Sequence, residues 1–120
     1  MQKTVKIGET EVMMRSSAAT AIRYRNVFHE DIMQALTKMD PEKMDATVIE
    51  KLQKLGYIMA RSAERADMTR LTEDDYMVWL DQFETIDMAQ ASKEILMLYL
   101  GNKLSSSELK KTEGTADPEK

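Results

Sequence analysis

Hydrophobic and polar residues follow two different periods along this chain. Over residues 3–14 they alternate around Gly8, which predicts a short β-hairpin. Farther along, apolar residues recur every three or four positions, the spacing of one buried helical face. The predicted helices span about residues 16–37, 45–66, 73–84 and 88–100. Because an isolated hairpin is only marginally stable in water, it should pack against these helices. The pattern therefore predicts a mainly α-helical single domain of about four helices with an N-terminal β-hairpin, within residues 1–103.

Polar residues at the expected helix ends support these boundaries. Ser16 and Ser17 precede the first helix, where a hydroxyl group can accept a hydrogen bond from a free backbone N–H. Thr72 precedes three acidic residues and is expected to cap the third helix. Gly101-Asn102 suits a left-handed turn and is expected to end the fourth. Residues 104–120 have few apolar side chains, so we expect a flexible tail that is disordered or weakly helical.

The composition is that of a globular protein rather than a disordered or membrane-spanning one. Charged residues make up 32% of the 120 residues and hydrophobic residues 42%. No apolar run approaches the roughly 18 residues needed to cross a bilayer, and the first residues lack the apolar core of a signal peptide. We therefore expect a cytoplasmic protein with no membrane partner. The absence of cysteine excludes disulfides, thiolate nucleophiles and zinc sites with sulfur ligands.

The charge distribution argues against a dedicated nucleic-acid binder. The formal net charge is −4 and the pI is about 5.1, whereas such a domain is usually strongly basic. Acidic residues concentrate in residues 73–87, while Arg15, Arg23 and Arg25 help to make the first quarter basic. An alternative therefore remains open, in which a small regulatory protein binds nucleic acid through this basic helix face. Such binding would weaken steeply as the salt concentration rises.

No group of residues predicts a catalytic, cofactor or metal site. His29, Glu30 and Asp31 carry suitable functional groups. Consecutive helical side chains, however, point about 100° apart, and the sequence has no second histidine. It also lacks a phosphate-binding glycine loop and a nucleophile-elbow motif. We therefore expect a protein that is not an enzyme, in which Arg23, Arg25 and Asp31 form structural ion pairs.

Apolar side chains on the last two predicted helices exceed what one buried face requires. An aromatic stripe on the third helix is more often core than interface. Met77 and Val78 beside this stripe, with Met97 and Leu100 on the following helix, nevertheless leave apolar surface to spare. Eleven methionines in the chain favour a surface that adapts to varied shapes. The predicted partner-contact residues are Tyr76, Met77, Trp79, Leu96 and Tyr99.

Four segments also form an ordered pattern along nearly the whole chain. They are the hairpin, residues 23–32 (RYRNVFHEDI), residues 57–61 (YIMAR), and an acidic helix start followed by WL..F at residues 79–83. This order resembles the small tail assembly chaperones of long-tailed bacteriophages and prophages of Gram-positive hosts, whose first helix carries a pattern like YR..FG.D. His29 stands where the family often has glycine. We therefore expect the first helix to continue through His29 rather than turn there.

The resemblance implies an assembly factor. Proteins of this family bind the long, aggregation-prone tape measure protein, keep it soluble and help tail tube subunits polymerise around it. Many are made in two lengths by ribosomal frameshifting, and the longer form recruits the tail tube protein. We therefore expect the chain to bind the tape measure protein in the bacterial cytoplasm without a cofactor, and to be absent from the mature virion. Self-association and a longer product are left open by the sequence.

Overall fold

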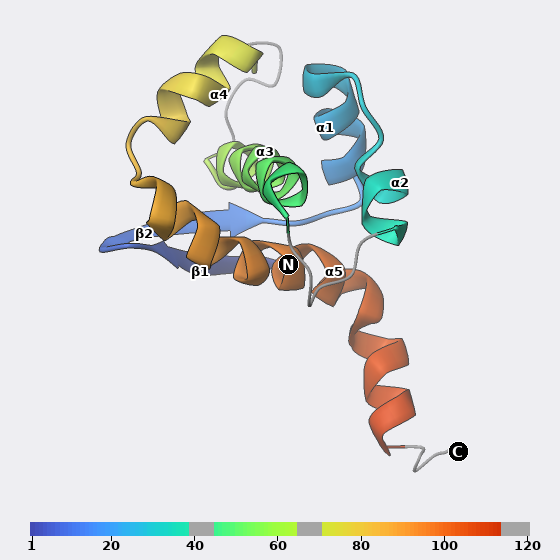
Figure 1. The fold of residues 1–120 in the computed structure, drawn as a ribbon. Coiled ribbons are helices and arrows are strands. Elements are labelled where there is room, and N and C mark those ends of the chain that lie inside the picture. The colour runs from blue at the N-terminus through green and yellow to red at the C-terminus, as the bar shows by residue number, and fades with distance from the viewer. Residues whose placement is uncertain (39–44, 65–70, 114–120) are drawn as a thin grey trace.

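The chain folds into a mainly helical domain with an N-terminal antiparallel hairpin, as the sequence pattern predicts (Figure 1). The computed structural model describes residues 1–38, 45–64 and 71–113, with side chains up to residue 101. The elements are β1 (Gln2–Ile7), β2 (Thr10–Arg15), α1 (Thr20–Phe28), α2 (Ile32–Thr37), α3 (Ala46–Ala63), α4 (Glu73–Leu80) and α5 (Thr85–Glu113). No helix in these ranges has the length and apolar character needed to cross a membrane.

The hairpin packs one face against the helices. Its strands pair in the register Val5 to Val12, and the side chains of Val5, Ile7 and Met14 are buried. Gly8 makes the turn at φ 63°, a conformation that glycine adopts without steric cost. A Cβ atom at Gly8 would also lie 2.5 Å from Oδ2 of Asp87, at the start of α5. The turn therefore requires glycine both for its backbone and for its contact with α5.

Helix α3 is the centre of the domain, with the hairpin, α1, α4 and α5 arranged around it (Figure 1). The Asp45 carboxylate caps its first turn by accepting a hydrogen bond from the Val48 N–H at 2.9 Å, close to the predicted start. Every residue from Leu55 to Ala60 is buried, so the helix has partners on all sides in its middle. Gly56 lets α5 approach closely, because a Cβ there would lie 2.9 Å from Cδ1 of Ile95.

The prediction of one helix over residues 16–37 is wrong, because the chain turns at His29. This residue has φ 59° and ends α1, with its N–H donating to the Arg25 carbonyl at 2.8 Å. The Asp31 carboxylate then accepts hydrogen bonds from the N–H groups of Met33 and Gln34, at 2.9 and 3.2 Å, and so begins α2. A new cap inside the predicted helix thus competes successfully with its continuation.

The start of the first helix also differs from the prediction. Helix α1 begins at Thr20, because Ser16 and Ser17 form hydrogen bonds outside the helix. Ser16 continues the hairpin, exchanging backbone hydrogen bonds with Met1 at 2.7 and 2.8 Å. Ser17 forms a local turn, in which its N–H donates to the Thr20 hydroxyl at 2.9 Å and its own hydroxyl accepts from the Ala19 N–H at 3.2 Å.

Thr72 caps α4 as predicted, accepting a hydrogen bond from the Asp75 N–H at 3.0 Å. Helix α4 ends at Leu80, earlier than the predicted residue 84, and α5 begins at Thr85 rather than at residue 88. Helix α5 passes through Gly101-Asn102 and reaches Glu113, so the predicted stop at this pair is wrong. A glycine favours a helix end but does not impose one. Residues 104–113 of the predicted tail are thus helical in backbone, and residues 114–120 lie outside the described residues.

Candidate functional site

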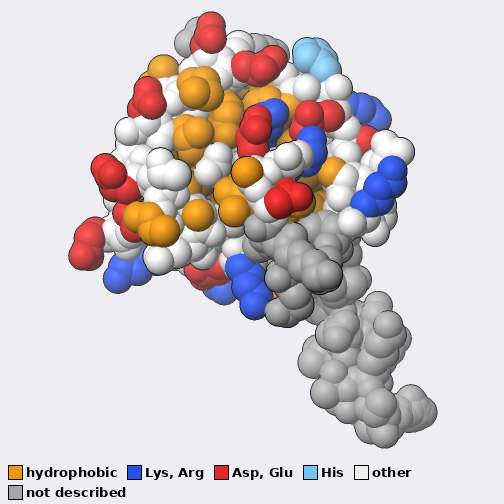
Figure 2. Space-filling view, viewed as in Figure 1, with side chains coloured by type: hydrophobic (Ala, Val, Ile, Leu, Met, Phe, Trp, Pro, Cys, Tyr) orange, Lys and Arg blue, Asp and Glu red, His pale blue; other side chains and the backbone are white. Residues whose placement is uncertain are grey.

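An apolar groove runs between α3, α4 and the first turns of α5. It encloses about 470 Å³. Figure 2 shows hydrophobic side chains gathered over these three helices. The groove is lined by Ala46, Ile49, Glu50, Gln53, Tyr76, Met77, Leu80, Thr85 and Ala89. Among these lining residues Glu50 is the only charged one, so the groove suits an apolar side-chain stripe.

Each helix supplies one face to the groove. On α3 the Asp45 cap fixes the first turn, and residues 46, 49, 50 and 53 then fall on one side at helical spacing. Helix α4 supplies Tyr76, Met77 and Leu80, and α5 supplies Thr85 and Ala89 one turn apart. Small side chains at residues 46 and 89 leave the space that the larger ones surround. The groove is thus built where the first half of α3 meets the consecutive helices α4 and α5, whose lining residues come more than 20 positions later in the sequence.

Met77 is the exposed apolar side chain on the rim of this groove. Its side chain is 52% exposed, and that of its neighbour Val78 is 66% exposed. Only Met77 of these two lines the groove. Methionine is flexible and polarizable, so it can adapt its shape to a bound partner.

Tyr76 forms part of the groove wall and stays neutral there. Burial, together with the nearby charge of Glu50, raises the pKa of Tyr76 to about 12. Its hydroxyl group lies 3.5 Å from Oε1 of Gln53, across from α4 on α3. Since the tyrosine is protonated at neutral pH, Glu50 sets the sign of the charge inside the groove.

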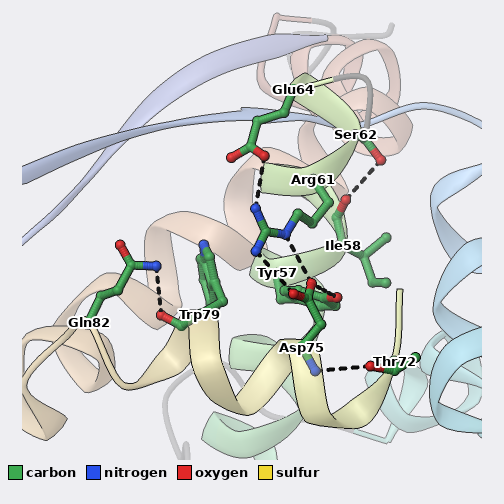
Figure 3. Close-up of polar contacts among 9 residues, drawn as sticks. All are labelled: Tyr57, Ile58, Arg61, Ser62, Glu64, Thr72, Asp75, Trp79 and Gln82. Atoms are coloured by element: carbon green, nitrogen blue, oxygen red, sulfur yellow. Dashed lines mark hydrogen bonds and ion pairs between the residues drawn. The ribbon is translucent and has the colours of Figure 1, made fainter. Parts of the chain in front are cut away.

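A polar cluster holds α4 against α3 beside the groove (Figure 3). The Tyr57 hydroxyl donates to Oδ2 of Asp75 at 2.5 Å, and Nε of Arg61 lies 3.2 Å from the same oxygen. Arg61 also pairs with Glu64 at 2.9 Å. Burial and the hydrogen bond to Asp75 raise the pKa of Tyr57 above its ordinary value. The cluster therefore fixes α4 through a hydrogen bond and an ion pair that share one carboxylate.

The structure places four of the five predicted contact residues in the core. Tyr76, Trp79, Leu96 and Tyr99 are each at most 4% exposed, and only Met77 is exposed. The Trp79 ring packs 5.8 Å from the ring of Tyr57 and 5.1 Å from that of Phe83. Of these four buried residues, Tyr76 alone lines the groove.

The residues predicted to form ion pairs have other contacts within the described parts of the chain. Arg23 donates a hydrogen bond to the Ser62 hydroxyl at 3.3 Å, and Asp31 caps α2. Arg25 is exposed, and its backbone carbonyl accepts the His29 N–H. No ion pair between described residues includes any of the three.

Glu30, rather than its neighbour Asp31, forms the structural ion pairs in this region. It accepts a hydrogen bond from the Tyr24 hydroxyl at 2.6 Å and pairs with Lys51 at 3.1 Å and with Lys54 at 4.0 Å. Burial opposes ionisation, but the hydrogen bonds from Tyr24 and Lys51 hold the pKa of Glu30 below its ordinary value. The Lys54 ammonium also lies 5.2 Å from the centre of the Phe28 ring. Glu30 therefore fastens the turn between α1 and α2 to α3.

Sequence reasoning missed the apolar groove residues Ala46, Ile49, Leu80 and Ala89. Their helical spacing is visible in the sequence, but the spacing alone does not show that the three faces meet. Within the part of the chain that the structure describes, no three His, Cys, Asp or Glu side chains are placed to hold a metal ion. Comparison of the chain with protein-family models, with curated proteins and with solved structures finds no match.

Proposed function

We propose that this protein is a bacteriophage tail assembly chaperone that binds the tape measure protein and keeps it soluble while the tail tube assembles. In this proposal the chaperone acts by non-covalent shielding, and the groove between α3, α4 and α5 receives an amphipathic helix of the tape measure protein. It acts in the bacterial cytoplasm and leaves before the virion is complete. A longer form of the chain, extended by frameshifting, would recruit the tail tube protein.

The observation that carries the proposal is the apolar groove with Met77 on its rim. Its volume of about 470 Å³ and its nearly uncharged lining suit the apolar face of a helix, which presents side chains at steps of three and four. A chaperone that holds a long protein must bind helices whose apolar side chains differ in size. Met77 on the rim favours such binding, because its side chain can repack around different shapes.

The turn at His29 adds support from the resemblance. The family often has glycine at this position, and the structure has a left-handed backbone there, with φ 59°. Glycine is the residue that adopts this conformation most readily. A turn at the position of the family's glycine is therefore what a shared fold would require, although this chain carries histidine.

Co-expression with the tape measure protein of the same gene cluster tests the proposal. The tape measure protein is expected in the soluble fraction, in complex with this chain, only when the chain is present. Met77→Lys should reduce the recovered complex by about tenfold. The charge would replace an apolar contact that the bound partner buries, worth about 1.5 kcal/mol or more.

Val78→Lys is the matched control. Both positions are exposed on α4 and receive the same charge, but Val78 does not line the groove. Equal loss in the two variants, or a tape measure protein that stays insoluble with the unaltered chain, contradicts the proposal. Binding of duplex DNA that weakens steeply with salt would instead favour the regulatory alternative.

A further inference from the structure

We propose that the groove selects a helix whose apolar face is flanked by lysine or arginine. The inference deepens the proposed function and rests on it for the identity of the natural partner. The charged residues that line the groove and the hollow beside it carry the inference, since they favour one sign of partner.

A second hollow of about 280 Å³ adjoins the groove and shares Gln53, Leu80 and Thr85 with it. Among the described residues that line the two, the charged ones are Glu50 and Asp81. Both are acidic; Glu50 lies on α3, and Asp81 directly follows the last residue of α4. A bound helix would therefore meet a carboxylate on the α3 side and another at the end of α4.

Asp81 is poorly placed for the stability of its own helix. It occupies the C-cap of α4, where the helix dipole is negative, and the last turn of α4 has no basic residue. Its side chain is exposed, and no ion pair between described residues includes it. An acidic residue that local structure disfavours is more readily explained by a partner.

Glu50 keeps an accessible charge although it has a cationic neighbour. Its side chain is 62% exposed, and Lys54 lies 3.5 Å from its carboxylate. Lys54 is only 16% exposed and also pairs with Glu30 at 4.0 Å. The charge that reaches the solvent at this side of the groove is therefore that of Glu50.

The margin formed by α4 and the residue before α5 has the same sign. Glu73 lies one helical turn before Met77, and Glu84 directly precedes Thr85; both are exposed. Residues 73–87 contain no lysine or arginine. At physiological salt, charges act over about 8 Å, so these carboxylates reinforce those of Glu50 and Asp81. A helix with basic flanks is favoured, and one with acidic flanks is repelled.

Two labelled synthetic peptides of 18 residues test the inference with the full chain. Both carry the same leucine and alanine stripe at helical spacing; one has lysine at the flanking positions and the other glutamate. Fluorescence anisotropy should show binding of the lysine peptide that weakens with salt. The glutamate peptide should bind at least about tenfold more weakly, since each exposed charge pair changes affinity by up to about fivefold.

Variants of the chain locate the effect. Glu50→Gln with Asp81→Asn should weaken binding of the lysine peptide by about two- to tenfold. Glu9→Gln with Glu11→Gln changes the net charge equally, on the exposed hairpin, and should leave the affinity within about twofold. Equal losses in the two pairs, equal binding of both peptides, or binding of neither overturns the inference.

The outcomes separate this inference from the proposed function. A tape measure protein that is held soluble by the chain, with no preference between the peptides, leaves the chaperone function standing and removes the charge selection. A preference for the lysine peptide without rescue of the tape measure protein leaves the charge selection standing and removes the chaperone function. Sedimentation that shows dimers of the chain, broken by Met77→Lys, means that a second copy covers the groove and overturns the inference.

Discussion

His29 holds a left-handed backbone conformation that costs an L-residue about 1–2 kcal/mol. The surrounding contacts compensate for this cost: Asp31 caps the following helix, and Glu30 reaches Lys51 from the same turn. The three residues His29, Glu30 and Asp31, which resemble a chemical site in the sequence, thus have a structural use. They divide one apolar pattern into two helices.

Replacing His29 with glycine should stabilise the domain. His29→Gly removes the left-handed strain and loses some of that gain to the greater freedom of the unfolded chain, which leaves an increase of about 0.5–1 kcal/mol in the free energy of unfolding. Urea denaturation measures it. Asn26→Gly, at an exposed position inside α1, is the control and should destabilise by about 0.5–1 kcal/mol. A loss of stability in both variants would contradict the strain at His29.

Glu30 makes stability depend on pH in the acid range. Its pKa in the folded protein lies below its ordinary value of 4.5. The ionised group therefore stabilises the fold above that ordinary value, and this contribution is lost as the pH falls through the folded-state pKa. Glu30→Gln should be less stable than the unaltered chain at pH 7, and the difference should shrink as the pH falls below 4.5.

Paired urea denaturations at pH 7 and at about pH 3.5 measure the difference between Glu30→Gln and the unaltered chain. Glu9→Gln, in the exposed hairpin turn, controls for the general effect of acid. A difference that stays constant between the two pH values would show that the carboxylate does not act through its charge.

At the scale of elements, α4 combines a well-marked start with a buried aromatic face. The sequence predicts its start because Thr72 and the acidic first turn act locally. It does not decide which side chains face the core, because aromatic spacing favours a core stripe but also fits an interface. The structure decides this: Trp79 packs between Tyr57 and Phe83, and Met77 on the next face is exposed.

Trp79→Ala should destabilise the domain by about 3–5 kcal/mol, because it removes a large side chain from a packed core. Chemical denaturation measures this loss. Val78→Ala, on the exposed side of the same helix, should change the stability by less than about 0.5 kcal/mol. An unchanged stability for Trp79→Ala, together with weaker partner binding, would mean that Trp79 acts mainly as a contact residue.

At the scale of the whole molecule, the sequence predicts the hairpin, the helical class and the starts of α3 and α4, since these depend on period and capping. It does not predict the break at His29, because Tyr24, Phe28 and Ile32 keep helical spacing across it. Helices α1 and α2 both pack on the same core, so the spacing survives the turn. The groove is also beyond the sequence pattern, because Ile49, Leu80 and Ala89 meet only once three helices are packed.

The central place of α3 also determines the order in which parts of the native protein open locally. Strand β2 and helices α1, α2, α4 and α5 each contact it, so one of these elements can detach while the others stay packed on α3. The backbone amides of residues 55–60 reach water only when several layers separate at once. Local opening should therefore begin at the periphery and reach α3 last, close to the free energy of complete unfolding. A protein built this way can loosen at its edges while its central helix stays intact.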